Sequence, residues 1–278
     1  MPNLNFVFIG PGRSGTTFID SVLRHDERIA LPERIKETNH FLKEGKTTED
    51  RFWSFFENSC GEKSACGEVA NMYVYDSRSI PNLASMGEQL TLHAILRNPY
   101  DRLVSSLRFR LSAGEIIDFK NFEDTFSRYP SLIEQSAYAT LLKPFLDQFG
   151  TRLKFYSFDD LRSNPEFVVR QFYNNIGLTA PASIPLEQTK QNIAQSPRSQ
   201  LLIRVGRTMS DGLRRLGMLG LLGRLKESIL VSKLLYTGTP LDINTSTWPP
   251  EVIARLNNEI EELSRLLEKD FSHWKRAV

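Results

Sequence analysis

The sequence predicts an α/β fold, an open parallel sheet with helices on both faces, followed by a helical C-terminal part. Three observations lead to this prediction. Short apolar runs alternate with amphipathic stretches between residues 5 and 178. The first run ends in a glycine-rich loop, and a later run, LTLHAILR at 90–97, ends in an Arg-Asn-Pro turn before a helical pattern. In open parallel sheets such turns lie at the carboxyl ends of strands, where ligands bind.

Each expected strand is a short apolar run that ends at a Gly, a Pro or a polar turn. These strands are expected at 5–10, 28–32, 90–97 and 153–158. The expected helices have apolar residues at helical spacing, with caps or prolines suited to a first turn. They are expected at 15–25, 48–58, from 98 onward, at 131–149, within 159–177 and at 248–274. A loop is expected at 178–199, and 200–236 is helical by composition.

Composition excludes several classes of protein. The chain has 278 residues, is 40% hydrophobic and 24% charged, and has no repeats, so we expect one domain over 1–278 with a core at 5–178 and a helical segment at 198–278. A net charge of +2 makes nucleic acid an unexpected partner. The chain shows neither a basic leader nor a run of 18 apolar residues, so we expect a cytoplasmic protein.

Candidate metal ligands are sparse. The only two cysteines are Cys60 and Cys66, and the four histidines are scattered along the chain. A zinc site needs more ligands at closer spacing, so we expect no metal and two ordinary thiols.

The loop sequence FVFIGPGRSGTTFI fits two motifs. Its three glycines match G-x-G-x-x-G, the dinucleotide fingerprint, for which Glu33 would bind the ribose. Gly10 and Gly15 alone match the phosphate-binding P-loop, except that Thr16 stands where that motif has lysine. The positive charge of the loop is on Arg13 instead. We therefore expect an anion held by backbone N–H groups and a helix start, without the usual lysine and magnesium.

A second anion site is expected after the strand at 90–97. Arg97 ends this strand, and Ser105 follows eight residues later on the predicted helix. An arginine and a hydroxyl on either side of a helix start can bind a second phosphate. A ligand with two separated anionic groups would contact both loops.

Together these residues resemble the sulfotransferases that use PAPS (3′-phosphoadenosine 5′-phosphosulfate). RSGTT after a strand is similar to the family's 5′-phosphosulfate loop, and LRNPYDRLVSSL is similar to its 3′-phosphate motif. QSAYATLLKPFLDQFG and RLKFYSFDDLRSNPEFVVRQFYNNIGL follow in the family's order, so the resemblance covers most of 5–178. It implies a P-loop-NTPase-like sheet, PAPS as sulfonate donor, PAP as product, and no metal.

The resemblance also implies roles for single residues. Many relatives carry lysine where this chain has Arg13. In this chain Arg13 would stabilise charge on the leaving group. Phe18 would stack on adenine or pack inside its helix. The remaining cofactor-binding residues implied are Ser14, Gly15, Thr16, Thr17, Arg97, Ser105 and Arg198.

KETNHFL at 36–42 resembles the K-E-x-H-F-F segment of heparan-type carbohydrate sulfotransferases, in which the Glu is the base. This match implies that Glu37 takes the proton of the acceptor. The family's histidine falls at Asn39, so His40, one residue later, is a second candidate. GEVANMYVY resembles the family's G-E-K-S-P-x-Y, which gives Glu68 a supporting role and leaves Val69 in place of a lysine.

The implied function is sulfonate transfer to a hydroxyl of a carbohydrate or glycoconjugate, with a small molecule, glycan or glycolipid as acceptor. Three alternatives remain open: a P-loop kinase, a nicotinamide-dependent oxidoreductase, and a nucleotide-binding module without catalysis. The segment 200–236 has seven Lys or Arg and two acidic residues. It is either a platform for an anionic or lipid-linked acceptor at a membrane surface or a helical pair with solvated charges.

Overall fold

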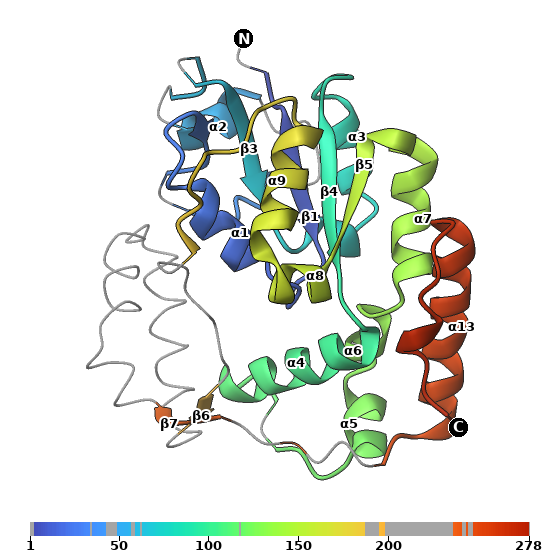
Figure 1. Cartoon of the computed structure of the whole chain (residues 1–278). Coiled ribbons are helices and arrows are strands. Elements are labelled where there is room, and N and C mark those ends of the chain that lie inside the picture. Colours follow the sequence, from blue (N-terminus) through green and yellow to red (C-terminus); the bar gives the residue numbers. More distant parts are fainter. Residues whose placement is uncertain are drawn as a thin grey trace. The chain divides into compact units, whose positions relative to one another are not determined.

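The computed structural model describes residues 3–33, 35–42, 49–56, 59–61, 63–116, 118–186, 195–197, 236–240, 243 and 247–277 (Figure 1). Contacts divide the chain into two compact units. The first comprises Met1–Arg102, Gln135–Gln191 and Arg255–Ala277, and the second comprises Leu103–Glu134, Asn192–Ala254 and Val278. The expectation of one domain stays a prediction. Arg198 and most of the basic segment 200–236 lie outside the described residues.

The first unit contains a five-stranded sheet in the order β2-β3-β1-β4-β5, in which every neighbouring pair is parallel. The strands are β1 (Phe6–Gly10), β2 (Ile29–Ala30), β3 (Ala65–Val69), β4 (Thr91–Leu96) and β5 (Leu153–Ser157). The predicted fold class is confirmed, and four of these strands lie where the sequence predicts them.

The fifth strand, β3, is absent from the sequence prediction. Its sequence ACGEV has a glycine and a glutamate inside a fully buried strand. Gly67 fits because the ring of Phe6, on the neighbouring strand, fills the space that a side chain would need. Glu68 is tolerated because it has hydrogen-bond partners in the interior.

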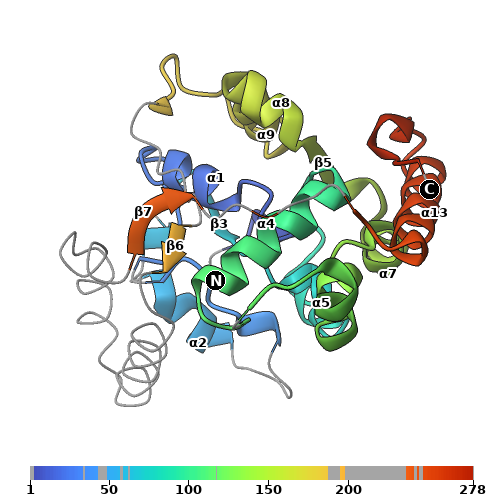
Figure 2. The ribbon, with the colours of Figure 1, turned by 90° about the horizontal axis from the view of Figure 1, so that it is seen from below.

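Helices cover both faces of this sheet. α1 (Thr16–Leu23) and α9 (Pro165–Asn175) pack against one face, where their apolar side chains form one cluster with those of β1. α3 (Ser79–Ala84) and α7 (Tyr138–Phe149) contact each other on the opposite face (Figures 1 and 2). Right-handed connections between parallel strands produce this arrangement, because the chain leaves β1 toward β2 but leaves β4 toward β5.

Several predicted helices are shorter than expected. The helix predicted at 131–149 is wrong as one element, because α6 (Ser131–Glu134) ends and α7 begins after the non-helical Ala137 (φ −82°, ψ 73°). Next to that break, the Ser136 hydroxyl accepts a hydrogen bond from the side chain of Arg102. The helix predicted at 48–58 is α2 (Glu49–Trp53) followed by a single 3-10 turn.

The stretch 159–177 forms α8 (Phe158–Ser163) and then α9. Asn164 caps α9 through its side chain, which accepts from the Phe167 N–H at 3.2 Å, and Pro165 occupies the first turn. The helix predicted at 248–274 is confirmed in part as α13 (Pro250–Leu266), which ends before a separate 3-10 turn at Ser272–Trp274.

The second unit begins within α4 (Pro99–Ser112) and includes α5 (Phe122–Arg128) and α6. Its aromatic core joins Phe122 to Trp248, whose ring centroids are 4.4 Å apart. A two-stranded antiparallel sheet joins β6 (Gln195–Pro197) to β7 (Tyr236–Pro240). β6 falls in a stretch predicted to be loop, because its polar sequence QSP has no strand pattern.

The two cysteines are not free. Cys60 and Cys66 form a disulfide with Cα atoms 5.5 Å apart, so the expectation of two thiols is wrong. The turn before β3 brings the two cysteines together. A spacing of six residues does not by itself predict that they pair. Within the described part of the chain, no helix is both long and apolar enough to cross a membrane.

The segment after α13 packs onto the start of α4. The Tyr100 hydroxyl donates to Asn257 Oδ1 at 2.9 Å, and the Asn257 amide donates to the Arg276 carbonyl oxygen at 2.8 Å. The Arg276 guanidinium also lies over the Tyr100 ring, 5.0 Å from its centre. Residues near the end of the chain thus hold the turn that follows β4.

Candidate functional site

The loop between β1 and α1 has two positions, Gly10 and Gly15, whose backbone conformation requires glycine. Gly10 has φ 111°, and a Cβ there would lie 2.7 Å from the Asn71 carbonyl oxygen. Gly15 has φ 92°, and a Cβ there would lie 2.5 Å from Leu161. At Gly12 the nearest atom would be 3.7 Å away, an ordinary contact. The glycines required by the protein itself therefore have the P-loop spacing, which favours a phosphate-binding loop over the dinucleotide fingerprint.

The start of α1 is polar and largely buried. Ser14 is 0% exposed and Thr16 4% exposed, whereas Thr17 is half-buried. The first N–H groups of a helix have no partner within the helix and carry the positive end of its dipole. Hydroxyls and N–H groups at this position suit a tetrahedral anion.

Three arginines gather beside this loop. Arg13 is in the loop itself, Arg97 follows β4, and Arg102 is in the first turns of α4. Arg97 Nη1 donates to the Arg13 carbonyl oxygen at 3.1 Å, and Arg102 Nη1 donates to the Gly12 carbonyl oxygen at 3.5 Å. Because the C=O and N–H of a peptide unit point in opposite directions, the N–H groups of Arg13 and Ser14 face away from these two arginines.

The three guanidinium groups are close enough to influence one another. Burial, and then repulsion by Arg97 and Arg102, lower the pKa of Arg13 from its usual value. Burial also lowers the pKa of Arg97, whose guanidinium lies 4.5 Å from the centre of the Phe158 ring. Positive charge that is concentrated and partly removed from water is stabilised by a bound anion.

Arg102 and Tyr75 are functional candidates that the sequence analysis missed. Arg102 is 1% exposed, and it donates to the Ser136 hydroxyl at 3.0 Å and to the Tyr75 hydroxyl at 3.1 Å. The same Tyr75 hydroxyl accepts the Gly12 N–H at 3.0 Å. The two side chains therefore fix the two peptide units on either side of Gly12. The available signal was an arginine among the apolar residues of the helix after LTLHAILR.

A buried carboxyl group lies at the carboxyl end of β3. Glu68 is 0% exposed, and it accepts from the Thr38 N–H at 2.5 Å and from the Tyr73 hydroxyl at 2.8 Å. Burial raises the pKa of Glu68 to about 7 although these hydrogen bonds act in the opposite direction, and the nearby Glu37 raises it further. Glu68 thus connects the segment 36–38 to the sheet.

The pH dependence of stability should reveal this carboxyl group. Since the pKa of Glu68 is about 7 when folded and 4.5 ordinarily, the folded state binds more protons between these values, and stability falls as pH rises through them. In Glu68→Gln the amide oxygen can still accept from the Thr38 N–H, and the amide NH2 can donate to the Tyr73 hydroxyl oxygen, so both contacts remain without a titrating group. The free energy of unfolding can be measured by urea denaturation at each pH. We expect the value for the variant minus the value for the wild type to increase by up to about 3 kcal/mol from pH 4.5 to pH 7.

The exposed Glu88 offers a matched control, because Glu88→Gln should leave the shape of the stability profile unchanged. Parallel profiles for wild type and Glu68→Gln would show that Glu68 is ionised in both states.

The segment 36–38 approaches the start of α1. Lys36 Nζ lies 3.4 Å from Thr16 Oγ1 and 3.0 Å from Glu37 Oε1. The side chains of Lys36 and Glu37 are 24% and 23% exposed, so both can reach a bound molecule. Glu37, the predicted base, is therefore linked through Lys36 to the start of α1.

The other predicted site residues are placed differently. The ring of His40 is 2% exposed and packs against Phe41 and Phe52, which favours a packing role over that of a base. Phe18 is half-buried against the cluster between α1 and the sheet, which favours packing over stacking on a ligand. Ser105 lies on α4 in the second unit, and its role stays a prediction, as does that of Arg198.

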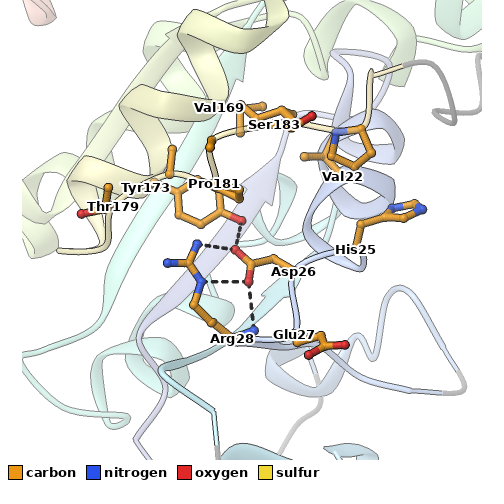
Figure 3. Close-up of a pocket in the computed structure, with 14 residues that line it drawn as sticks. Val22, His25, Asp26, Glu27, Arg28, Val169, Tyr173, Thr179, Pro181 and Ser183 are labelled. Carbon is orange, nitrogen blue, oxygen red and sulfur yellow. Dashed lines mark hydrogen bonds and ion pairs between the residues drawn. The ribbon is translucent and has the colours of Figure 1, made fainter.

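A separate pocket of about 370 Å³ lies at the other end of α1 (Figure 3). Asp26 is at its centre and accepts from Arg28 Nη2 at 2.7 Å and from the Tyr173 hydroxyl at 2.7 Å. Burial alone would raise the pKa of Asp26, but the hydrogen bonds from Arg28 and Tyr173 outweigh it and lower the pKa to about 2. The ion pair closes the turn before β2, and the hydrogen bond from Tyr173 ties that turn to α9, so these contacts have a structural role.

The described residues include no group of three or more His, Cys, Asp or Glu side chains that could hold a metal ion. The carboxyl ends of β1, β3 and β4 bring together a glycine-containing loop, a cluster of arginines, a lysine and carboxyl groups.

A scan against protein-family models finds no match, and a search of curated proteins finds none. Solved structures do match. The crystal structure of a sulfotransferase from Alicyclobacillus acidocaldarius has a TM-score of 0.64 and 18% identity, over 99% of this chain and 100% of that one. The sulfotransferase domain from the curacin biosynthetic pathway has a TM-score of 0.51 and 13% identity, over 69% of this chain and 79% of that one. The chain therefore has the fold of these sulfotransferases.

Proposed function

We propose that this protein transfers the sulfonate group of PAPS to a hydroxyl group of an acceptor. The observation that carries the proposal is the cluster of Arg13, Arg97 and Arg102 beside a loop whose required glycines have P-loop spacing. The fold shared with solved sulfotransferases agrees with it, although a fold alone does not define an activity.

The two ends of PAPS would contact two neighbouring strand ends. The loop after β1 and the start of α1 would hold the 5′-phosphosulfate, through the N–H groups and hydroxyls of residues 14–17 and through Arg13. Arg97, after β4, would hold the 3′-phosphate, with Ser105 and Arg198 as further proposed contacts. β1 and β4 are adjacent, and the chain leaves them toward opposite edges of the sheet, which is where ligands bind in such folds.

Each chain group then has a task in the transfer. Glu37 takes the proton of the acceptor hydroxyl, whose oxygen attacks the sulfur. The bond between sulfur and the 5′-phosphate oxygen breaks, and its electron pair stays on PAP. The loop N–H groups and the guanidinium of Arg13 stabilise that charge without donating a proton. Catalysis then consists of positioning and electrostatic stabilisation, as in phosphoryl transfer.

The nature of the acceptor rests on KETNHFL alone. Its similarity to heparan-type carbohydrate sulfotransferases supports a carbohydrate or glycoconjugate acceptor. The basic segment 200–236 would then face an anionic or lipid-linked acceptor.

Calorimetric titration of the wild type with PAP, ATP and NAD, without magnesium, tests the cofactor. PAP has both anionic groups that the two loops are proposed to hold, so we expect it to bind at least 100-fold more tightly than ATP or NAD. Tighter binding of ATP would indicate a kinase-like site, and tighter binding of NAD would return Glu33 and the dinucleotide fingerprint to consideration.

A further inference from the structure

We propose that Lys36 is a further catalytic residue, whose ammonium group contacts the transferring sulfonate at the start of α1. This inference deepens the proposed sulfonate transfer and rests on it. The P-loop motif has its lysine at the position that Thr16 occupies in this chain. The structure brings an ammonium group to that position from a different segment, because Lys36 Nζ lies 3.4 Å from Thr16 Oγ1.

Lys36 and the arginines reach the loop from different segments and contact different loop residues. β3 and β4 flank β1 in the sheet. Arg97 and Arg102 follow β4, and they donate to the carbonyl oxygens of Arg13 and Gly12 in the loop. The segment of Lys36 is instead tied to β3, through the hydrogen bond from Thr38 to Glu68. Lys36 therefore brings positive charge to the start of α1 from a segment other than the one that carries Arg97 and Arg102.

The surroundings of Lys36 suit a charged group that meets a substrate. Its side chain is 24% exposed and pairs with Glu37 at 3.0 Å, so the ammonium group is held in place but remains accessible. Thr16 beside it is buried, at 4% exposure, and begins α1. An ammonium group is a compact charge with three donors, and it can contact the sulfonate and Glu37 at the same time.

The step assigned to Lys36 is electrostatic. While the acceptor oxygen bonds to sulfur and the sulfur–oxygen bond to PAP breaks, negative charge spreads over the sulfonate oxygens and the departing phosphate oxygen. The acceptor proton goes to Glu37 and the electron pair of the broken bond goes to PAP, so Lys36 keeps all its protons. A positioned donor at developing negative charge typically contributes about 10² to 10³ in rate.

The test compares Lys36→Met with Lys36→Arg in two measurements. One is the single-turnover conversion of radiolabelled PAPS to PAP and sulfate, with water as acceptor, and the other is calorimetric binding of PAP. Because PAP lacks the sulfonate, we expect Lys36→Met to change its dissociation constant less than threefold while the conversion rate falls about 100-fold. Lys36→Arg restores the charge and should recover part of the rate. Lys143→Met, at an exposed lysine of α7, is the control and should leave the conversion rate unchanged.

Repeating the comparison in a Glu37→Gln protein shows whether Lys36 acts on the sulfonate itself or only positions Glu37. If Lys36 acts on the sulfonate, Lys36→Met also slows PAPS conversion in a Glu37→Gln protein; if it acts only through Glu37, it has no further effect there, and the proposal is wrong. Loss of PAP binding in parallel with rate would make Lys36 a phosphate ligand and would also overturn the proposal. If the wild type converts PAPS and Lys36→Met converts it at the same rate, only this inference is refuted. A wild type that neither binds PAP nor consumes PAPS refutes the proposed function as well.

Discussion

Replacing Arg97 with alanine is expected to weaken PAP binding at least 100-fold, a loss of about 2.7 kcal/mol. The variant loses the guanidinium proposed to hold the 3′-phosphate, and charge-assisted hydrogen bonds of this kind are among the strongest in proteins. It also loses the hydrogen bond from Arg97 Nη1 to the Arg13 carbonyl oxygen, which fixes the loop proposed to hold the other end of PAP. Calorimetric titration of both proteins with PAP measures the effect.

Arg152 provides a matched control for this variant. Its guanidinium lies 5.0 Å from the centre of the Phe149 ring and donates to the Gly87 carbonyl oxygen at 3.3 Å. These are the same kinds of contact that Arg97 makes with Phe158 and Arg13, but Arg152 precedes β5 and therefore lies at the opposite end of the sheet. Arg152→Ala should leave PAP affinity unchanged. Equal affinity of Arg97→Ala and wild type for PAP would remove the main support for the proposed function.

Replacing Glu37 with glutamine is expected to lower kcat for sulfonate transfer about 10²- to 10⁴-fold, because a positioned general base typically contributes that much. The amide has nearly the shape of the carboxylate, and its oxygen can still accept from Lys36, so the affinity for PAP should remain that of the wild type. The measurement is the initial rate of sulfonate transfer from radiolabelled PAPS to a panel of hydroxyl acceptors, starting with oligosaccharides.

Two further variants assign the base. Glu33→Gln changes a solvent-exposed acid in the preceding turn and should leave the rate unchanged. His40→Phe keeps an aromatic ring in the cluster with Phe41 and Phe52, and it should also leave the rate unchanged. A large loss of rate in His40→Phe together with a normal rate in Glu37→Gln would move the role of base to His40.

Most of the fold could be predicted because four strands are short, mainly apolar runs with clear ends. β3 could not, because its burial depends on partners that are distant in sequence: the ring of Phe6 occupies the space above Gly67, and Thr38 and Tyr73 satisfy Glu68. The sequence of β3 alone does not indicate which distant residues will contact it. The break between α6 and α7 is hidden in the same way, because an apolar repeat continues across it.

The part of the candidate site that lies within one short motif could be predicted from the sequence. The spacing of Gly10 and Gly15 indicated an anion-binding loop, and the structure shows why those two glycines are required. Arg102 and Lys36 were missed because each reaches the loop from another segment, through contacts with Gly12 and Thr16 that only the folded chain creates.

The contact between the start of α4 and the segment after α13 has a consequence for synthesis. Tyr100 and its partner Asn257 are separated by 157 residues. At about 5 to 20 residues per second, a ribosome needs roughly 10 to 30 s to add the chain between them. During that interval β1, its loop and Arg97 already exist, but the turn after β4 lacks the residues that hold it. A nascent chain can therefore form the loop after β1 early, and it gains the contact that holds Tyr100 only when α13 emerges.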